Sequence, residues 1–441
     1  MTQEVAQKSK RAIVAAVQLS GVNDLEFDAS LAELRQLAKT LGFEVVGAFT
    51  QKRARFDSAA YFGLGKREEL RLLQEERSAD VILVDHEISP SQAHNLEKEV
   101  GCEVMDRTMV ILEIFHRHAR SRAARAQVEI ARLGYMAPRL REAAKLAGPQ
   151  GRQRSGVGGR SGGESDRELD RRKIRDRIAE LQKELDAMVL ERKTQRARRQ
   201  ERQGLARVAL VGYTNAGKST LMRALTGSEA LVADKLFATL DTTVRALHPE
   251  TVPRVLVSDT VGFIKNLPHG LVASFKSTLD EALEASLLVH VVDASDPGFE
   301  RQLAVTEEVL DEIGAKAVPR LLVFNKIDRA GDEPGQRERE AALRAQFPGC
   351  IVMSAHREGD IAKLHEAIAA FFQRDLVEAE LFLPWAAQKM RGEVFAICKV
   401  LEERADGEGV FLRILGEPEA VKRLHEQFGR ASDNGRGTDD A

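Results

Sequence analysis

An apolar run that leads into a glycine-containing loop, and from there into a helix, constrains the fold of this chain more than any other feature. The run Ala206–Val211 has the length and composition of a buried strand. The pattern GxxxxGKS follows it from Gly212 to Ser219, and a helix is expected over Thr220–Leu225. A strand, a loop and a helix in this order are typical of an α/β fold.

The same loop predicts a phosphate-binding site. Its glycines let backbone N–H groups curl around a β-phosphate, and the helix N-terminus adds a partial positive charge. We expect Lys218 to reach the β- and γ-phosphates as a catalytic group, and the Ser219 hydroxyl to ligate Mg²⁺. The loop residues expected at the nucleotide are Gly212, Tyr213, Thr214, Asn215, Ala216, Gly217, Lys218, Ser219 and Thr220.

Three later strand ends carry polar segments in the order that a nucleotide site needs. After Arg254–Ser258 comes Asp259-Thr260-Val261-Gly262, in which Asp259 would hold a Mg²⁺-bound water and the catalytic Gly262 N–H would sense the γ-phosphate. The other two segments are Asn325-Lys326-Ile327-Asp328 and Ser354-Ala355-His356. Ligands of open α/β sheets bind at this carboxyl edge, so we expect the segments to meet there.

The base is predicted from Asp328. A carboxylate there can accept hydrogen bonds from N1–H and the 2-amino group of guanine, and adenine has neither donor. The Ala355 N–H could meet the guanine O6. The sequence therefore favours GTP over ATP as the substrate.

A threonine-rich segment lies between the first two of these motifs. It reads Phe237-Ala238-Thr239-Leu240-Asp241, followed by Thr242 and Thr243. A GTP switch needs one threonine hydroxyl that ligates Mg²⁺ only while the γ-phosphate is present. On spacing, all three threonines are candidates, and a threonine-rich loop entering a strand is the alternative interpretation.

Phe263 stands directly after Gly262, where many GTPases have a glutamine that orients water. A phenyl ring can neither orient nor deprotonate water. We therefore expect slow intrinsic hydrolysis, with the attacking water positioned by another residue or by a partner.

Charge is distributed unevenly along the chain. The formal net charge is −2, but residues 117–154 hold ten Lys and Arg against Glu129 and Glu142, a local balance of +8 that leaves −10 elsewhere. The stretch runs into the arginine-bearing loop Gly148–Gly163, which has seven glycines in 16 residues. This asymmetry indicates contact with a phosphate backbone, and a solvated helix face is the alternative.

The chain of 441 residues divides by pattern into five parts. We expect a small parallel α/β domain over 1–106, a helical hairpin over 107–203, a P-loop domain over 204–373, a small α+β domain over 374–430 and a disordered tail over 431–441. In the hairpin we expect Gly134 and Pro138 to kink or break the first helix. Ile174, Ile178, Leu181, Leu185 and Met188 give the second helix a coiled-coil spacing, although packing on a neighbouring domain would explain this stripe equally well.

Other classes of protein are disfavoured. The three cysteines lie far apart, which disfavours a disulfide scaffold or a structural zinc site. No apolar run approaches the roughly 18 residues of a membrane span, and residues 1–11 lack the apolar core of a signal peptide. We expect a monomeric cytoplasmic protein without stable membrane insertion.

These motifs together resemble the HflX family of translational GTPases. The resemblance is carried by GYTNAGKST at 212–220, Phe237-Ala-Thr-Leu-Asp241 and Asp259-Thr-Val-Gly-Phe263, and upstream by Tyr61-Phe-Gly-Leu-Gly-Lys66 and Val84-Asp-His-Glu87. The chain departs from the family pattern at Thr242, where proline is usual, and over 161–168 in the hairpin.

The resemblance implies more than the spacing does. It selects Thr239 as the Mg²⁺ ligand, and it implies binding of the 50S ribosomal subunit and its rRNA, with ribosome-stimulated GTP hydrolysis to GDP that splits or rescues stalled ribosomes. A GTP-gated 50S assembly or hibernation factor, in which hydrolysis is only a timer, is the second hypothesis. A switch acting on a protein target away from RNA is disfavoured by the +8 stretch.

Overall fold

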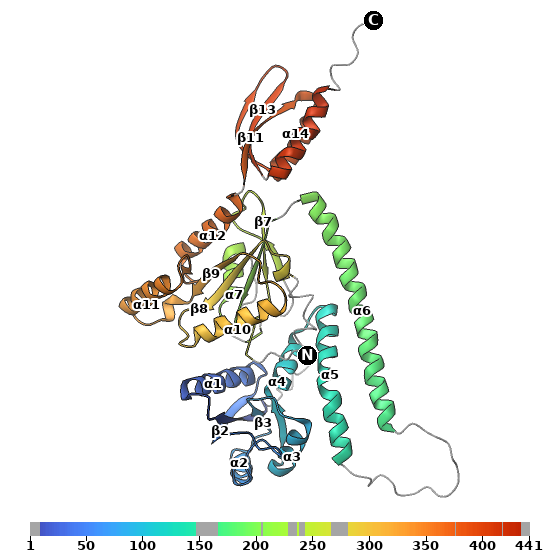
Figure 1. Ribbon diagram of the computed structural model, residues 1–441, viewed down its shortest axis with the longest axis vertical. Helices are drawn as coiled ribbons and strands as arrows, with labels where there is room; N and C mark the ends of the chain where they lie inside the picture. Colours follow the sequence, from blue (N-terminus) through green and yellow to red (C-terminus); the bar gives the residue numbers. More distant parts are fainter. Residues whose placement is uncertain are drawn as a thin grey trace, which may run out of the picture.

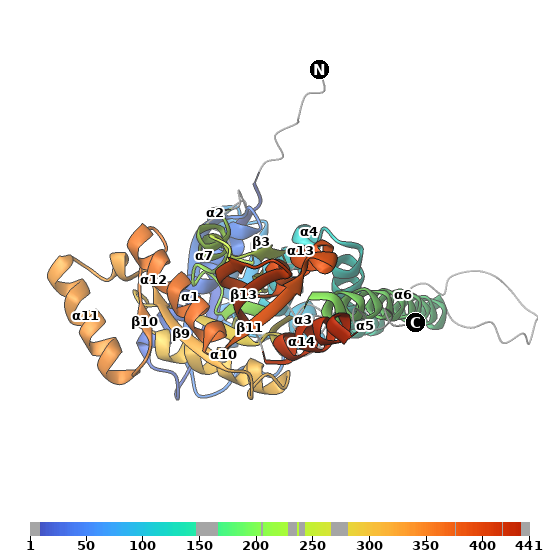
Figure 2. The same cartoon turned by 90° about the horizontal axis from the view of Figure 1, so that it is seen from above.

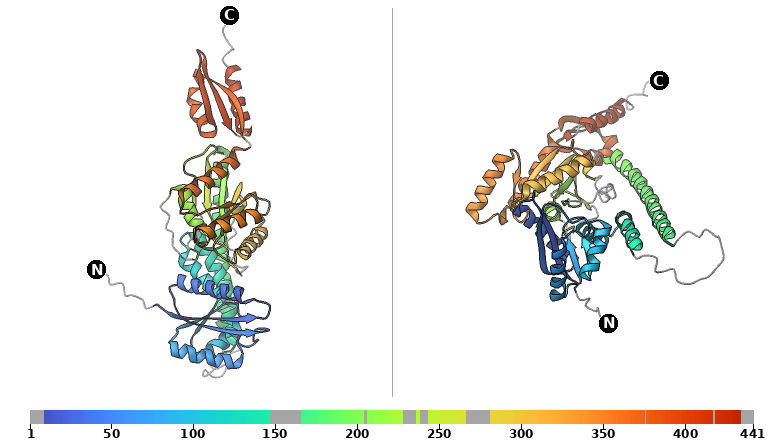
Figure 3. Two further views of the ribbon diagram at one scale, coloured as in Figure 1. Left: turned by 90° about the vertical axis from the view of Figure 1, so that its left-hand side faces the viewer. Right: turned by 60° about the horizontal axis from the view of Figure 1, so that its bottom comes forward.

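The computed structural model describes residues 9–146, 166–203, 206–227, 236–237, 243–265, 281–374, 376–416 and 418–433. Figure 1 shows three compact units in succession along the long axis, with two long helices beside them. The left view of Figure 3 shows the same stacking from the side. The predicted fold class is confirmed: two α/β units, a long antiparallel helical hairpin and a small α+β unit.

The N-terminal unit is a four-stranded parallel sheet in the order β2-β1-β3-β4. Strand β1 is apolar on both faces because helices cover both, α1 and α4 on one side and α2 and α3 on the other. The strands are β1 (Arg11–Leu19), β2 (Glu44–Arg53), β3 (Val81–Val84) and β4 (Glu103–Asp106). The helices are α1 (Asp24–Thr40), α2 (Leu64–Arg77), α3 (Pro90–Val100) and α4 (Arg107–His118).

Two long helices, α5 (Arg122–Leu146) and α6 (Asp166–Gln203), form an arm that projects away from the body on the side opposite α11 (Figure 2). Leu181 and Leu185 of the predicted stripe are buried against Ala123 and Ala126, so the stripe packs within the arm. The loop Gly148–Gly163 lies outside the described residues.

Of the predicted kink or break in the first arm helix, the break was wrong, and the kink stays a prediction. Helix α5 runs through Gly134 and Pro138, and the chain bends earlier, at residues 119–121. The carbonyl that Pro138 cannot bond belongs to Gly134, where no side chain restricts a local tilt. Arg139, one residue on, donates to Asp106 Oδ2 (2.6 Å), so tertiary bonds hold the helix past the proline.

The central unit is a six-stranded sheet in the order β10-β9-β8-β5-β7-β6, parallel except for β6. Its strands are β5 (Ala206–Gly212), β6 (Thr243–Ala246), β7 (Val255–Asp259), β8 (Leu287–Asp293), β9 (Arg320–Asn325) and β10 (Ile351–Val352). The helices in its described part are α7 (Lys218–Thr226), α10 (Phe299–Glu312), η1 (Ile327–Arg329), α11 (Glu333–Gln346) and α12 (Glu358–Gln373).

One cluster of buried side chains is continuous between the N-terminal and central units. It joins Phe115 of α4 to Phe237 and Phe263 of the central unit. The two units therefore share a core across their boundary.

The C-terminal unit is a three-stranded antiparallel sheet, order β11-β13-β12, with its own core. Within residues 394–401, the first residues are helical and the last belong to a strand. Val394 and Cys398, four residues apart, both face the core, which is a helical spacing. The elements are β11 (Val377–Pro384), η2 (Trp385–Met390), α13 (Arg391–Ile397), β12 (Lys399–Ala405), β13 (Gly409–Gly416) and α14 (Pro418–Asp433).

Candidate nucleotide site

The GxxxxGKS loop joins the end of β5 to the start of α7. Asn215 and Gly217 both have positive φ (60° and 97°), which curls the backbone ahead of the helix N-terminus. An added Cβ at Gly217 would lie 2.2 Å from Asn325 Nδ2, so a side chain has no room there. The loop thus has the conformation in which N–H groups can surround a phosphate.

Lys218 lies beneath this loop and is almost fully buried. Its Nζ donates to the carbonyls of Gly212 (3.0 Å) and Tyr213 (2.8 Å). Burial lowers the pKa of Lys218 to about 8, although Asp259 opposes this shift. A bound phosphate would favour the charged ammonium and offset the cost of burying it.

Ser219 and Asp259, which come from different elements, meet at the carboxyl edge of the sheet. Ser219 Oγ donates to Asp259 Oδ2 over 2.8 Å, and Asp259 ends β7 beside β5. A hydroxyl and a carboxylate are oxygen ligands of the kind that Mg²⁺ prefers, so this pair fits the ion. Among the described residues, no group of three or more His, Cys, Asp or Glu could hold a metal by itself. Mg²⁺ sites of this kind are completed by substrate phosphates and water.

The segment after Asp259 lies against the loop. Thr260 Oγ1 donates to the Leu210 carbonyl (2.6 Å), and Val261 is buried. A Cβ on Gly262 would lie 3.0 Å from Lys218 Nζ and 2.9 Å from Thr214 Cα, so only glycine fits there. The Gly262 backbone is therefore next to the ammonium that is expected to contact the γ-phosphate.

The predicted switch segment is described only in part. Ala238, Thr239, Leu240, Asp241 and Thr242 lie outside the described residues. Phe237 is buried, and Thr243 begins β6 opposite Asp259. The choice among the three threonines therefore stays a prediction.

Phe263 packs in the core instead of facing the nucleotide site. It is 1% exposed, and its backbone pairs with the loop: its N–H donates to the Gly212 carbonyl (3.1 Å), and its carbonyl accepts from Thr214 N–H (2.7 Å). The residue after Gly262 thus ties the loop to β7.

Asn325 connects three of the predicted segments. Its Nδ2 donates to the Ala216 carbonyl (3.0 Å), and its Oδ1 accepts from Ala355 N–H (2.9 Å). The Ala355 N–H, which we expected at the guanine O6, is therefore bonded within the protein. Ser354 is buried, and its hydroxyl accepts from His356 N–H (3.2 Å).

Lys326 and Asp328 flank the expected base site. Lys326, with φ of 64°, donates from Nζ to the Asn215 carbonyl (2.5 Å) and to Asp293 Oδ2 (2.8 Å). Among the described residues, Asp328 Oδ1 is buried with no hydrogen-bond partner. Buried carboxylate oxygens are normally paired, so guanine N–H donors would satisfy a group that the protein leaves unpaired.

The sequence analysis missed Asp293. It ends β8, whose apolar run is as clear as that of β7, and it pairs with Lys326. The strand-end rule that selected Asp259 would have selected Asp293 too.

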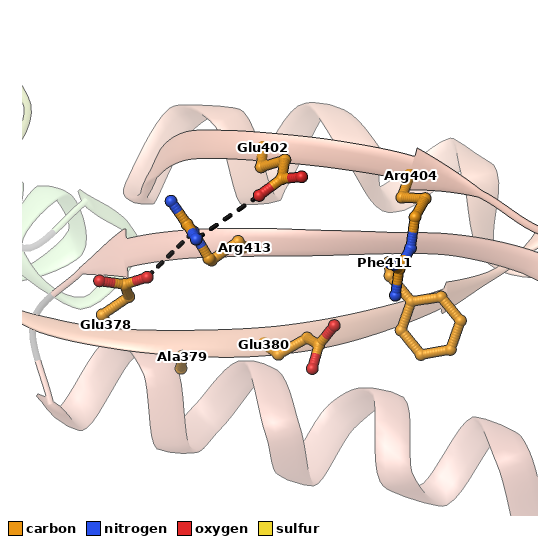
Figure 4. A pocket seen from close by; sticks show the side chains of 7 residues that line it. All are labelled: Glu378, Ala379, Glu380, Glu402, Arg404, Phe411 and Arg413. Atoms are coloured by element: carbon orange, nitrogen blue, oxygen red, sulfur yellow. Dashed lines mark ion pairs between the residues drawn. The ribbon is translucent and has the colours of Figure 1, made fainter.

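A groove on the open face of the C-terminal sheet is separate from this site (Figure 4). There Arg413 lies between two carboxylates, Nε 3.0 Å from Glu378 Oε1 and Nη1 3.5 Å from Glu402 Oε2. Cross-strand pairing explains these charges.

Three families match successive parts of the chain. Residues 28–116 match the family described as GTP-binding GTPase N-terminal, residues 118–199 the GTP-binding GTPase Middle Region, and residues 207–326 the 50S ribosome-binding GTPase. A GTPase HflX of Gluconacetobacter diazotrophicus is 51% identical over 94% of this chain and 96% of its own length. The chain belongs to the HflX family of GTPases. The Escherichia coli GTPase HflX is 35% identical over 91% of this chain and 92% of its own.

Family membership confirms the resemblance seen in the sequence and makes the chain a GTP hydrolase that binds guanine nucleotides. A crystal structure of a GTP-binding protein from Sulfolobus solfataricus in complex with GDP is 23% identical, covering 81% of this chain and 99% of that one with a TM-score of 0.43. In the described part of the chain, no helix is long and apolar enough to cross a membrane.

Proposed function

We propose that this chain is a cytoplasmic, monomeric GTPase that binds the 50S ribosomal subunit through its helical arm. Ribosome binding stimulates GTP hydrolysis, and the cycle splits or rescues stalled ribosomes. The observation that carries the proposal is the combination of a GTP site with a basic arm in a chain that matches the 50S ribosome-binding GTPase family.

The two helices of the arm pack together and carry exposed basic side chains. Apolar packing between α5 and α6 and an ion pair across the arm, Arg177 Nε to Glu129 Oε1 (3.0 Å), keep the two helices together. Arg175 and Lys183 are exposed on α6. Exposed basic side chains such as these suit the phosphate backbone of rRNA.

Part of the +8 stretch has a structural role instead. Arg139 pairs with buried Asp106, and Arg132 lies 3.8 Å from Glu113. Arg125 Nε donates to the Ala119 carbonyl (3.2 Å) at the bend before α5. The arginines near the body are thus partly engaged in holding the arm in place, which makes the α6 residues better choices for testing rRNA contact.

In the site, we propose that Ser219 and Thr239 hold Mg²⁺ directly and that Asp259 holds it through a water. Mg²⁺ would neutralise charge on the β- and γ-phosphates during transfer to water. Lys218 and the Gly262 N–H would contact the γ-phosphate. Because Phe263 is buried and apolar, intrinsic turnover is expected to be slow and the ribosome to supply what positions the water.

Steady-state GTPase assays with purified 50S and 70S particles test the proposal. We expect both particles to raise turnover, and GTP-bound protein to convert 70S into subunits on sucrose gradients. If neither particle raises turnover, the proposal is wrong. If 50S binds only the GTP state and 70S never dissociates, hydrolysis acts as a timer for a 50S-bound factor.

A charge variant tests the arm. Arg175→Glu with Lys183→Glu should weaken 50S binding roughly tenfold and flatten its dependence on salt, because fewer counterions are released. Arg337→Glu, on the exposed face of α11, is the matched control and should bind as the wild type does. Equal binding by all three proteins would exclude this face of α6 from contact with rRNA.

A further inference from the structure

Leu236 and Phe237, where the chain enters the switch segment, are held by the N-terminal unit. Leu236 N–H donates to Thr40 Oγ1 at the end of α1 (3.2 Å), and the Phe237 carbonyl lies 2.8 Å from His118 Nδ1. The Phe237 ring also packs edge-to-face on Phe115, with centroids 4.6 Å apart. Both residues are nearly fully buried by these contacts.

The backbone of Phe237 is strained. Its φ of 55° is in the left-handed region, which bulky residues rarely adopt. Such a conformation persists only where surrounding contacts impose it. Strained backbone conformations are often found in switch regions. Here the contacts come from α1 and α4, so the N-terminal unit sets the backbone of Phe237.

His118 lies at the junction between helices α4 and α5. It is the last residue of α4, and the chain bends at residues 119–121 to enter α5 of the arm. The Ala119 N–H donates to the Phe115 carbonyl (2.9 Å), so the bend is fixed relative to the ring that packs on Phe237. A displacement of the arm would therefore be transmitted to His118.

The hydrogen bond also fixes the chemistry of the imidazole. A carbonyl only accepts, so Nδ1 must carry a hydrogen and donate a hydrogen bond to Phe237 O. This bond is partly shielded from solvent, and an asparagine amide can replace an Nδ1–H donor at similar reach.

We propose that His118 is a positioning residue for GTP hydrolysis. By holding the Phe237 carbonyl, it fixes the backbone two residues before Thr239, the predicted Mg²⁺ ligand, and couples that backbone to the arm. The inference rests on the proposed function, because the arm is taken to be the part that meets the ribosome. Binding at the arm would then act on the switch segment through α4.

The test compares three variants of the full chain. His118→Ala removes the donor, His118→Asn keeps one, and His116→Ala changes an exposed histidine of the same helix. Loss of one hydrogen bond predicts that His118→Ala lowers 50S-stimulated kcat by about fivefold to tenfold. It should also raise the Mg²⁺ concentration needed for half-maximal turnover. GDP affinity should stay within about twofold, because GDP has no γ-phosphate for the switch threonine to sense.

The outcomes separate the possibilities. His118→Asn should keep most of the wild-type activity, and His116→Ala should keep all of it. Equal kcat and equal Mg²⁺ dependence in all proteins would overturn the proposal. If the wild type is not stimulated by 50S, the proposed function fails, while intrinsic turnover and Mg²⁺ dependence still test His118. If His118→Ala cannot bind GDP, Thr40→Val removes the neighbouring contact from α1 and should lower kcat in the same way; an unchanged kcat there would refute the coupling.

Discussion

The side chain of Asn325 lies against the phosphate loop, with Nδ2 3.0 Å from the carbonyl oxygen of Ala216. The same amide accepts from Ala355 N–H, so one side chain holds together segments that are far apart in the sequence. Asn325 and Ala216 are each 1% exposed.

Replacing Asn325 with alanine should therefore weaken GDP and GTP binding by at least about tenfold, because it leaves a carbonyl and an N–H unpaired. Titration with a fluorescent GDP analogue measures this effect. Asn95→Ala is the control, because Asn95 bonds the Ala59 carbonyl within the N-terminal unit and should not affect the nucleotide. Equal affinities for the two variants would contradict the role of Asn325.

Asp328→Asn should lower the preference for GTP by at least roughly 100-fold and admit xanthosine triphosphate, because the hydrogen-bond pattern at the base changes. The measurement is competition between the two nucleotides in GTP turnover. Asp311→Asn, at an exposed carboxylate that pairs with Lys316, is the control. Unchanged discrimination in Asp328→Asn would refute the guanine assignment.

Gly212→Ala should destabilise the central unit by roughly 3 kcal/mol or more, because the new methyl group collides with backbone. A Cβ there would lie 2.1 Å from the Val291 carbonyl oxygen, and φ is 145°. Thermal unfolding and GDP binding report the loss. Gly359→Ala, where a Cβ meets nothing within 4 Å, should unfold like the wild type. Normal stability of Gly212→Ala would show that β5 and β8 are less closely packed.

His290, in the middle of β8, should make the central unit sensitive to acid. Burial, with smaller contributions from Arg320 and Lys218, lowers the pKa of His290 to about 3. In the unfolded chain the group binds a proton below about pH 6.5, whereas the folded form stays neutral, so stability falls as the pH drops through 6.5.

At about pH 5 this difference corresponds to about 2 kcal/mol of lost stability relative to neutral pH. His290→Leu should remove that part of the pH dependence in urea unfolding, whereas His116→Ala should keep it. An identical change between neutral and acidic pH in His290→Leu and the wild type would show that His290 is not buried as a neutral group.

The parts of the site that could be predicted are those with local signals. The loop from Gly212 to Ser219 and the strand ends at Asp259 and Asn325 each follow an apolar run, and the parallel sheet brings such ends together. Bonds between segments carry no local signal: Asn325 and Ala216 are 109 residues apart. For this reason the hydrogen bond from Ala355 N–H to Asn325 Oδ1 could not be foreseen.

In helix α5, tertiary contacts act against a local sequence signal. Pro138 is a strong local signal for a break, yet Arg139 and Tyr135 bond Asp106 at the end of β4 and keep the helix in place. Tertiary bonds outweighed the local preference. The sequence pattern of α5 contains nothing that pairs Arg139 with an aspartate 33 residues earlier.

The shared core between the N-terminal and central units has a consequence for how the molecule unfolds. Phe115, Phe237 and Phe263 belong to one cluster, so neither unit can open without exposing the aromatic side chains of the other. We expect these two units to melt in a single transition, and the C-terminal unit, with a separate core, to melt independently. A central unit cut free of its N-terminal neighbour would present Phe237, whose ring packs on Phe115, to water and would tend to self-associate.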